Sequence, residues 1–273
     1  MATTVIRSTQ ARPGWGAELR SMLRHRDLLW LLTRKDLRLK YKGTALGFLW
    51  SLLNPLLLML VYSFVFTIIA RFPVPRYPVF LLAGILPWNT FAIAISSAAT
   101  TIIGNGNLIR RVRFPREFLP LASVLSSAVN LTLSLGILLI FALYFHQPLG
   151  LPLLELPLLL ILQIIFTAGV ALILAAVTVY LRDVENLIGV FITVMFFLTP
   201  ILYPLSALAG HKSAYLVQLN PMAWLITDYQ AIWHENRWPD PIQTAAFGVL
   251  SVATLVGGWL LFRRLEQRFA EEV

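Results

Sequence analysis

The chain has 273 residues, of which 58% are hydrophobic and 13% charged, and its mean hydropathy is +0.75. A soluble helical protein of this composition would have too little polar surface to face water, so the composition predicts a protein embedded in a membrane. The formal net charge is +9, and the absence of cysteine excludes disulfides, thiol catalysis and cysteine metal sites.

Residues 1–45 are predicted to form a cytoplasmic lead that ends in an amphipathic helix. A helical pattern begins at Ala17, Asp27 is a candidate cap for a second helix, and Trp30, Leu37 and Tyr41 recur on one helical face. The basic residues among them are Arg34, Lys35, Arg38, Lys40 and Lys42. We expect this segment to lie along the cytoplasmic headgroups with its apolar side down. The alternative is a solvated charged tail.

Six apolar stretches follow, each long enough to cross a hydrocarbon core of about 30 Å as a helix rising about 1.5 Å per residue. They run from Leu46 to Ala70, Val79 to Ile103, Phe118 to Phe145, Leu156 to Leu181, Leu187 to Leu205 and Thr244 to Phe262. The Asn54-Pro55 pair in the first stretch predicts a kink, because proline lacks the amide hydrogen that the helix needs. We therefore predict an all-α membrane protein with six transmembrane helices, a membrane domain over residues 46–263 and a cytoplasmic tail over 264–273.

The positive charges predict the orientation of these helices. Ten Lys and Arg residues precede Leu46, four lie between Ile103 and Phe118, one lies between the fourth and fifth stretches, and three follow Phe262. The loops on the other side hold four in all. By the positive-inside rule, both termini are expected in the cytoplasm, with the chain in the plasma (inner) membrane. The same clustering assigns the net charge to membrane lipids rather than to nucleic acid.

The loop over residues 105–117 is predicted to contain a short cytoplasmic helix. Asn105 is expected to cap it, Leu108, Ile109 and Val112 to form its apolar side, and Pro115 to stop it. Its arginines are Arg110, Arg111, Arg113 and Arg116. Such a helix fits a cleft in a partner protein. Plain charge anchoring would explain the arginines but not the apolar side.

Between the fifth and sixth stretches lies an outer segment of nearly 40 residues that is interrupted by prolines yet contains apolar helical patches such as Met222 to Ile232. It is too interrupted to span and too apolar for a free loop, so we expect one or two short helices that dip into the outer leaflet. The acids Asp228, Glu235 and Asp240 are expected to contact headgroups rather than to form an enzyme site.

Several chemical motifs are missing from the sequence. It contains no Gly-x-x-x-x-Gly-Lys-[Ser/Thr] loop to hold nucleotide phosphates, and its four histidines have no metal-ligand spacing. No metal and no cofactor are therefore expected in this chain. No charged residue falls in the interior of the six stretches, whereas ion-coupled transporters commonly have carboxylates there. An energy source outside the membrane domain is expected.

Aromatic residues are abundant, with 17 Phe, 8 Trp and 8 Tyr. Interfacial belts and helix packing account for most of them. Some are candidates to line an interior path, because flat rings offer apolar stacking faces to sugars. These candidates are Trp50, Tyr62, Phe66, Trp88 and Phe91.

Several strings together resemble the permease subunit of type-2 ABC exporters for cell-surface polysaccharides, a family that includes O-antigen, capsule, teichoic acid and galactan exporters. The strings are RLKYKGTALGFLWSLLNP at 38–55, FLLAGILPW at 80–88, LIRRVRFPRE at 108–117, LRD at 181–183, PILYP at 200–204 and NPM at 220–222. They occur in order over nearly the whole chain, and their combination is specific.

The resemblance implies a homodimer that pairs with two copies of a separate ATPase, which binds ATP and Mg²⁺, while the polymer moves between the two permeases. It implies ATPase-coupling roles for Trp30, Arg34, Leu37, Arg38, Tyr41, Asn105, Leu108, Ile109, Arg110, Arg111, Arg113, Phe114, Pro115, Arg116 and Glu117. The segment from Tyr203 to Trp238 resembles the short outer gate helices of the family. Its candidate gate residues are Tyr203, Pro204, Asn220, Pro221 and Trp224.

The sequence therefore predicts a permease subunit that moves a lipid-linked polysaccharide across the plasma membrane and has no ATPase site of its own. One alternative is a type-2 permease for a drug or a small lipid. Another is a membrane-embedded glycosyl- or acyltransferase, which would need convergent carboxylates or a His-Asp pair at one face. A flippase driven by ion gradients is a further alternative, weakened by the uncharged spans.

Overall fold

The computed structural model describes residues 25–269 except 45, 48, 70, 72, 113 and 209–212. Within these residues all regular secondary structure is helical, which confirms the predicted all-α class. The helical pattern predicted to begin at Ala17 and the side chain of Arg113 lie outside the described residues.

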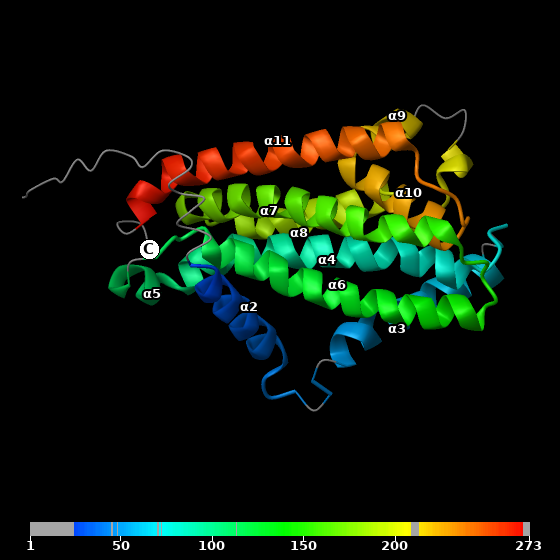
Figure 1. The fold of residues 1–273 in the computed structure, drawn as a ribbon, viewed down its shortest axis with the longest axis horizontal. Coiled ribbons are helices and arrows are strands. Elements are labelled where there is room, and N and C mark those ends of the chain that lie inside the picture. Colours follow the sequence, from blue (N-terminus) through cyan, green and yellow to red (C-terminus); the bar gives the residue numbers. More distant parts are fainter. Residues whose placement is uncertain are drawn as a thin grey trace, which may run out of the picture.

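Four long helices form the body of the molecule and run side by side (Figure 1). They are α4 (Tyr77–Gly104), α6 (Phe118–Tyr144), α7 (Leu156–Tyr180), which follows the 3₁₀ turn η2 (Leu151–Glu155), and α11 (Pro241–Leu265). All four are long and apolar enough to cross a membrane. The predicted second, third, fourth and sixth spans match them to within three residues at each end.

Two apolar helices are shorter. The first, α3 (Leu49–Ser63), contains Pro55 and continues as the π-helix η1 (Phe64–Ile69). The second, α8 (Val184–Leu198), has 15 residues and ends before the predicted limit at Leu205. It ends early because Pro200 disfavours the helical conformation for Thr199, which is extended at φ −104° and ψ 137°. The described residues thus contain four long candidate spans and two shorter apolar helices, rather than six helices of similar length.

One end of the bundle carries α2 (Arg26–Tyr41), α5 (Gly106–Arg111) and the end of α11 with the 3₁₀ turn η4 (Glu266–Arg268) (Figure 1). We call this the inner end.

The predicted boundaries of the helices at the inner end were partly wrong. His25 occupies the N-cap of α2, and Asp27 lies in the first turn, where its carboxylate favours the helix dipole. Helix α5 ends at Arg111, four residues before Pro115.

The opposite end carries η3 (Leu205–Leu208), α9 (Ser213–Gln218) and α10 (Pro221–Trp233) (Figure 1). Helix α10 contains the predicted helical patch from Met222 to Ile232, and ten of its thirteen residues are buried. It packs closely on α4, where a Cβ atom added to Gly84 would lie 3.0 Å from Nε2 of Gln230. This end of the molecule is therefore a packed layer rather than a loose loop.

The crossing of α7 and α11 depends on two glycines. A Cβ atom added to Gly169 would lie 2.5 Å from the backbone carbon of Thr254, and one added to Gly258 would lie 2.3 Å from the carbonyl oxygen of Gly169. Helices in a membrane associate largely by van der Waals packing, and small residues let their backbones approach. The two backbones are in direct contact here.

Replacing Gly258 by alanine should lower the unfolding temperature of the detergent-solubilised protein. The added methyl group overlaps the backbone of α7, and such overpacking typically costs about 1–3 kcal/mol. Gly257→Ala is the matched control, because a Cβ atom at Gly257 meets nothing within 4 Å and alanine favours the helix. Equal unfolding temperatures for the two variants would contradict the proposed role of this crossing.

Candidate functional site

Helix α2 is attached to the bundle by buried apolar contacts and by polar side-chain contacts. Leu32 is 6% exposed and packs in a cluster with residues of α5, α6, α7 and α11. Lys35 Nζ donates to Asn105 Oδ1 at 3.1 Å, and Ser123 Oγ donates to Asp36 Oδ2 at 3.3 Å. Burial raises the pKa of Asp36, while the neighbouring Lys35 charge and the Ser123 hydrogen bond lower it. The position of α2 is therefore fixed relative to α5 and α6.

Helix α2 packs on the bundle through leucines outside the predicted stripe of Trp30, Leu37 and Tyr41. Leu28 and Leu29 pack against the same cluster as Leu32, whereas Trp30 is 58% exposed. The polar side chains of Lys35 and Asp36 find partners in Asn105 and Ser123. That the stripe of Trp30, Leu37 and Tyr41 lies on the headgroups stays a prediction. Leu37 and Tyr41 are half-buried, and Arg34 and Arg38 are exposed.

Helix α5 also packs differently from the prediction. Ile109 is 5% exposed and belongs to the buried cluster of Leu32, with Leu108 packed beside it, so this side of the helix is covered by the chain itself. Asn105 makes no side-chain cap, because its Nδ2 donates to the carbonyl of Thr101 at 2.8 Å while its Oδ1 accepts from Lys35.

The loop after α5 is only partly exposed. Val112 is 50% exposed, and Arg110 and Arg111 are exposed. Phe114 packs against the Leu32 cluster, and Arg116 Nη1 donates to the carbonyl of Glu266 at 2.6 Å. Pro115 and Glu117 are half-buried. Of the residues predicted to contact a partner here, Trp30, Arg34, Arg38, Arg110, Arg111 and Val112 are exposed. We call these six residues the inner-end surface.

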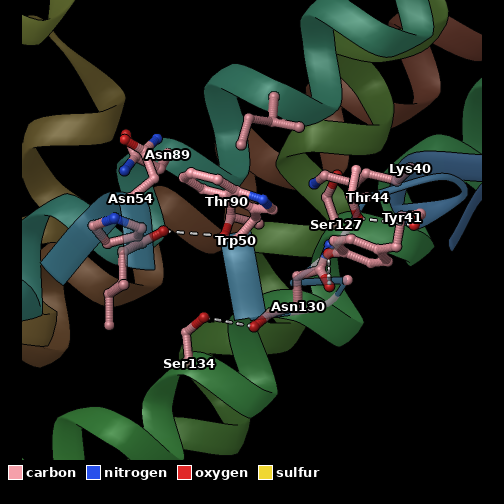
Figure 2. Close-up of a pocket in the computed structure, with 14 residues that line it drawn as sticks. Lys40, Tyr41, Thr44, Trp50, Asn54, Asn89, Thr90, Ser127, Asn130 and Ser134 are labelled. Carbon is pink, nitrogen blue, oxygen red and sulfur yellow. Dashed lines mark hydrogen bonds between the residues drawn. The ribbon is translucent and has the colours of Figure 1, made fainter. Parts of the chain in front are cut away.

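A cavity of about 350 Å³, here called the inner cavity, lies where α2 turns into α3 (Figure 2). Its walls come from α2, α3, α4 and α6 and the intervening turn. The turn contains Gly43 and Gly47, both with positive φ. The lining residues are Lys40, Tyr41, Thr44, Gly47, Trp50, Asn54, Pro55, Leu86, Asn89, Thr90, Ile93, Ser127, Asn130 and Ser134. Among these described residues Lys40 is the single charged side chain.

A second cavity of about 330 Å³, here called the outer cavity, lies between α4, α7, α8 and the start of α10. Trp88 and Phe91 line it and are 2% and 4% exposed, and the Phe91 ring stacks on Phe166 with centroids 5.9 Å apart. Its remaining lining is almost entirely apolar. The two cavities therefore differ in chemistry, because the inner one combines apolar side chains with several carboxamides and hydroxyls, whereas the outer one is aromatic and aliphatic.

Four of the five predicted path residues belong to one chain of ring contacts, because Phe66 contacts Tyr62, Phe196 contacts both Tyr62 and Trp88, and Trp88 contacts Phe91. Trp50 lies apart from them. Trp50 lines the inner cavity, whereas Trp88 and Phe91 line the outer cavity. Tyr62 and Phe66 are half-buried neighbours on α3 and η1, and Tyr62 lies 6.4 Å from Phe196 between ring centroids. Whether these rings line a path remains a prediction.

The predicted gate residues hold the layer around α10 in place. Tyr203 donates to the carbonyl of Phe197 at 2.9 Å, and Trp224 Nε1 donates to the carbonyl of Gln218 at 2.7 Å. Asn220 caps α10 by accepting from the amide of Met222 at 3.0 Å, and Pro221 occupies the first turn. Pro204 is half-buried in the segment that precedes η3.

Sequence reasoning missed two buried glutamines that connect α10 to the bundle. Gln163 Nε2 donates to the carbonyl of Pro87 at 2.8 Å, and its Oε1 accepts from the Tyr229 hydroxyl at 3.1 Å. Gln230 Nε2 donates to the carbonyl of Pro200 at 2.9 Å. A glutamine within an apolar run is the signal that was available, because a polar side chain in a membrane helix needs a partner.

Asp228 was predicted to contact headgroups, and this is wrong. It is 2% exposed, and its two carboxylate oxygens accept from Thr244 Oγ1 and Gln243 Nε2, each at 3.0 Å. Burial raises the pKa of Asp228 to about 7, and these two hydrogen bonds offset only part of that effect. The nearby charges of Glu155 and Asp240 raise the pKa further. Asp228 therefore connects α10 to the start of α11.

Comparison with known proteins gives matches over most of the chain. A family model described as "ABC-2 type transporter" matches residues 27–232. The chain is 36% identical to the O-antigen export system permease protein RfbA of Myxococcus xanthus, over 93% of this chain and 98% of that protein. It is 32% identical to an RfbA protein of Klebsiella pneumoniae, over 90% and 94%. It is 22% identical to the polysialic acid transport protein KpsM of Escherichia coli, over 85% and 91%.

Asp228 should give the stability of the protein a defined pH dependence. The unfolded chain loses this proton near pH 3.8, whereas the folded protein keeps it until about pH 7. The folded state binds more protons between these values, so its stability falls as the pH rises through this window and levels off above it. The slope from one such proton is at most about 1.4 kcal/mol per pH unit.

Unfolding temperatures of the wild type and Asp228→Asn, measured from pH 4.5 to 8, test this expectation. The unfolding temperature of the wild type should fall relative to that of Asp228→Asn as the pH rises to about 7, and the difference should then stay constant. Parallel profiles over the whole range would show that Asp228 does not titrate as described.

Proposed function

Because the chain belongs to the ABC-2 type transporter family, we propose that it is the membrane-spanning permease subunit of an exporter for lipid-linked cell-surface polysaccharide. Family membership identifies it as a multi-pass membrane permease that works with a partner ATPase. The observation that carries the polysaccharide assignment is the match to two O-antigen export permeases over nine tenths or more of both chains. The match to a capsular polysaccharide transporter agrees with it.

The chemistry of the two cavities supports a carbohydrate substrate. Apart from Lys40, the polar groups of the inner cavity are carboxamides, hydroxyls and an indole ring, and the outer cavity has aromatic and aliphatic side chains. Neutral hydrogen-bonding groups and flat rings hold sugars without deep electrostatic traps, so a long polymer can keep moving. A permease for a small apolar drug would not need the polar wall of the inner cavity.

We propose six spans with both termini in the cytoplasm, a membrane domain over residues 46–263 and cytoplasmic segments over 1–45 and 264–273. Helix α3 with η1 covers 21 residues from Leu49 to Ile69, which is about 30 Å of helix. Helix α8 covers about 22 Å, and the segment after Thr199 would complete the crossing. The clustering of Lys and Arg at the inner end supports this orientation.

We propose a homodimer in which α3 and α8 face the partner subunit. Ile188 is the only buried residue of α8, and Leu187, Val190, Phe191, Val194 and Phe197 are exposed. On α3, Leu57, Leu60 and Val61 are exposed. The polymer would pass between the two subunits, and the layer around α10 with Tyr203, Pro204, Asn220, Pro221 and Trp224 would close the outer side.

The inner-end surface is the proposed ATPase contact. Its arginines stand beside an exposed tryptophan and an exposed valine, and the buried side of α5 transmits force to α2, α6 and α7 through the Leu32 cluster. ATP and Mg²⁺ would be bound by two copies of the ATPase, which supply the chemical step.

Export by the reconstituted complex tests the proposed function. Vesicles that contain this chain and its ATPase should move a polyprenyl diphosphate-linked polysaccharide across the bilayer when ATP is added. The chain alone should hydrolyse no ATP and move no polymer, because its sequence has no P-loop. ATP hydrolysis by the purified chain alone, or ATP-driven transport of drugs but not of polymer, would contradict the proposal.

Charge reversal at the inner-end surface tests the ATPase contact. Arg38→Glu and Arg111→Glu should each weaken ATPase binding by roughly 5- to 10-fold, because a like charge replaces an attractive one at the interface. Arg71→Glu is the matched control, since Arg71 is exposed but lies just before α4, away from the inner end. Titration of the ATPase onto each variant in nanodiscs measures the effect. Unchanged binding for both inner-end variants would place the contact elsewhere.

A further inference from the structure

Asn130, in the wall of the inner cavity, has a hydrogen-bond donor without a partner. The residue is 7% exposed, and its Oδ1 accepts from the Tyr41 hydroxyl at 2.9 Å, which orients the amide. Its Nδ2 has no partner among the described residues. An unpaired buried donor destabilises the folded protein, and a ligand oxygen in the cavity would remove that cost.

The hydroxyl groups beside Asn130 supply the complementary acceptors. Thr90 Oγ1 donates to the carbonyl of Leu86 at 3.0 Å, and Ser134 Oγ donates to the carbonyl of Asn130 at 2.8 Å (Figure 2). Each hydroxyl has used its hydrogen within its own helix, so lone pairs on its oxygen remain to accept from a ligand. A wall that both donates and accepts is what a sugar hydroxyl requires.

Two further side chains add the other elements of a sugar phosphate site. Trp50 is 48% exposed and lines the cavity, so part of its ring surface is accessible for stacking on a pyranose. Lys40 brings a positive charge to a lining that has no carboxylate. The volume of about 350 Å³ lies in the range of small-molecule sites.

The cavity also lies beside the start of the apolar helix α3, at the point where the basic helix α2 gives way to it. Leu57, Leu60 and Val61 expose an apolar surface along α3 beyond the cavity. A lipid with its headgroup in the cavity would find a path for its hydrocarbon chain beside these residues.

We propose that the inner cavity binds the glycosyl phosphate headgroup of the lipid that carries the polymer. Lys40 pairs with the phosphate, Trp50 stacks on the adjoining sugar ring, and Asn130 Nδ2 donates to a sugar oxygen. This inference rests on the proposed function, because a lipid-linked polysaccharide has such a headgroup. It adds that each subunit recognises the carrier end of the substrate rather than only its repeating units.

Binding of defined lipids to the complex in nanodiscs, measured by native mass spectrometry, tests the proposal. The probes are a polyprenyl diphosphate disaccharide, polyprenyl phosphate without sugar, and phosphatidylglycerol. Trp50→Leu and Asn130→Leu should each weaken binding of the disaccharide lipid by roughly 5- to 10-fold and leave binding of polyprenyl phosphate unchanged. Lys40→Gln should weaken both. Trp50 is exposed, so this variant remains informative if Asn130→Leu folds poorly.

Thr132→Val is the matched control, because Thr132 lies two residues from Asn130 on α6, is exposed and does not line the cavity. Wild-type affinity in all three cavity variants, or equal binding of phosphatidylglycerol and the disaccharide lipid, would overturn the proposal. ATP-driven export by the same complexes separates this outcome from failure of the proposed function. Intact export together with unaffected binding removes only the cavity assignment, whereas no polymer export by the wild type removes the exporter assignment.

Discussion

Polar groups inside a bilayer must find partners within the protein, and this requirement organises the whole structure. The bundle meets it by joining helices through single buried amides. Gln163 connects α7 to α4 and α10, and Gln230 connects α10 to the carbonyl of Pro200. At the inner end, the half-buried Asn105 connects the end of α4 to α2 by accepting from Lys35. Each amide that satisfies a neighbouring helix also fixes its position, so the same contacts that remove unpaired groups define the fold.

Two buried polar residues differ from these amides. Asn130 is buried and has an unpaired donor among the described residues, and the carboxyl group of Asp228 is buried. Asp228 finds its hydrogen-bond partners within the protein, because two side chains donate to it, and its raised pKa favours the protonated form. The Oδ1 atom of Asn130 accepts from the Tyr41 hydroxyl, whereas its Nδ2 donor is left for a ligand in the cavity. Asp228 therefore stabilises the fold, whereas the donor of Asn130 is available to the proposed ligand.

The sequence predicts the four long helices well because the length and hydropathy of their apolar runs determine them. The four long helices agree closely with the apolar runs, and even the outer patch around Met222 was expected as a helix. The side-chain contacts could not be predicted in the same way. The stripe of Trp30, Leu37 and Tyr41 gives no sign that Leu32 packs on the bundle, because that packing depends on residues supplied by distant segments. Spacing along one helix has no information about such partners. The pairing of Gly169 with Gly258 lies 89 positions apart and is invisible to local periodicity for the same reason.

The contact between Gly169 and Gly258 has a mechanical consequence. Where helices meet through side chains, rotamer changes let one slide against the other, but a backbone-to-backbone contact has no such freedom. Helices α7 and α11 must therefore travel as one rigid body whenever the protein changes shape. Helix α8, with a single buried residue, has no comparable restraint. In a transport cycle the displacement would then be concentrated in the loosely held helices, while the α7–α11 pair acts as the fixed frame against which they turn.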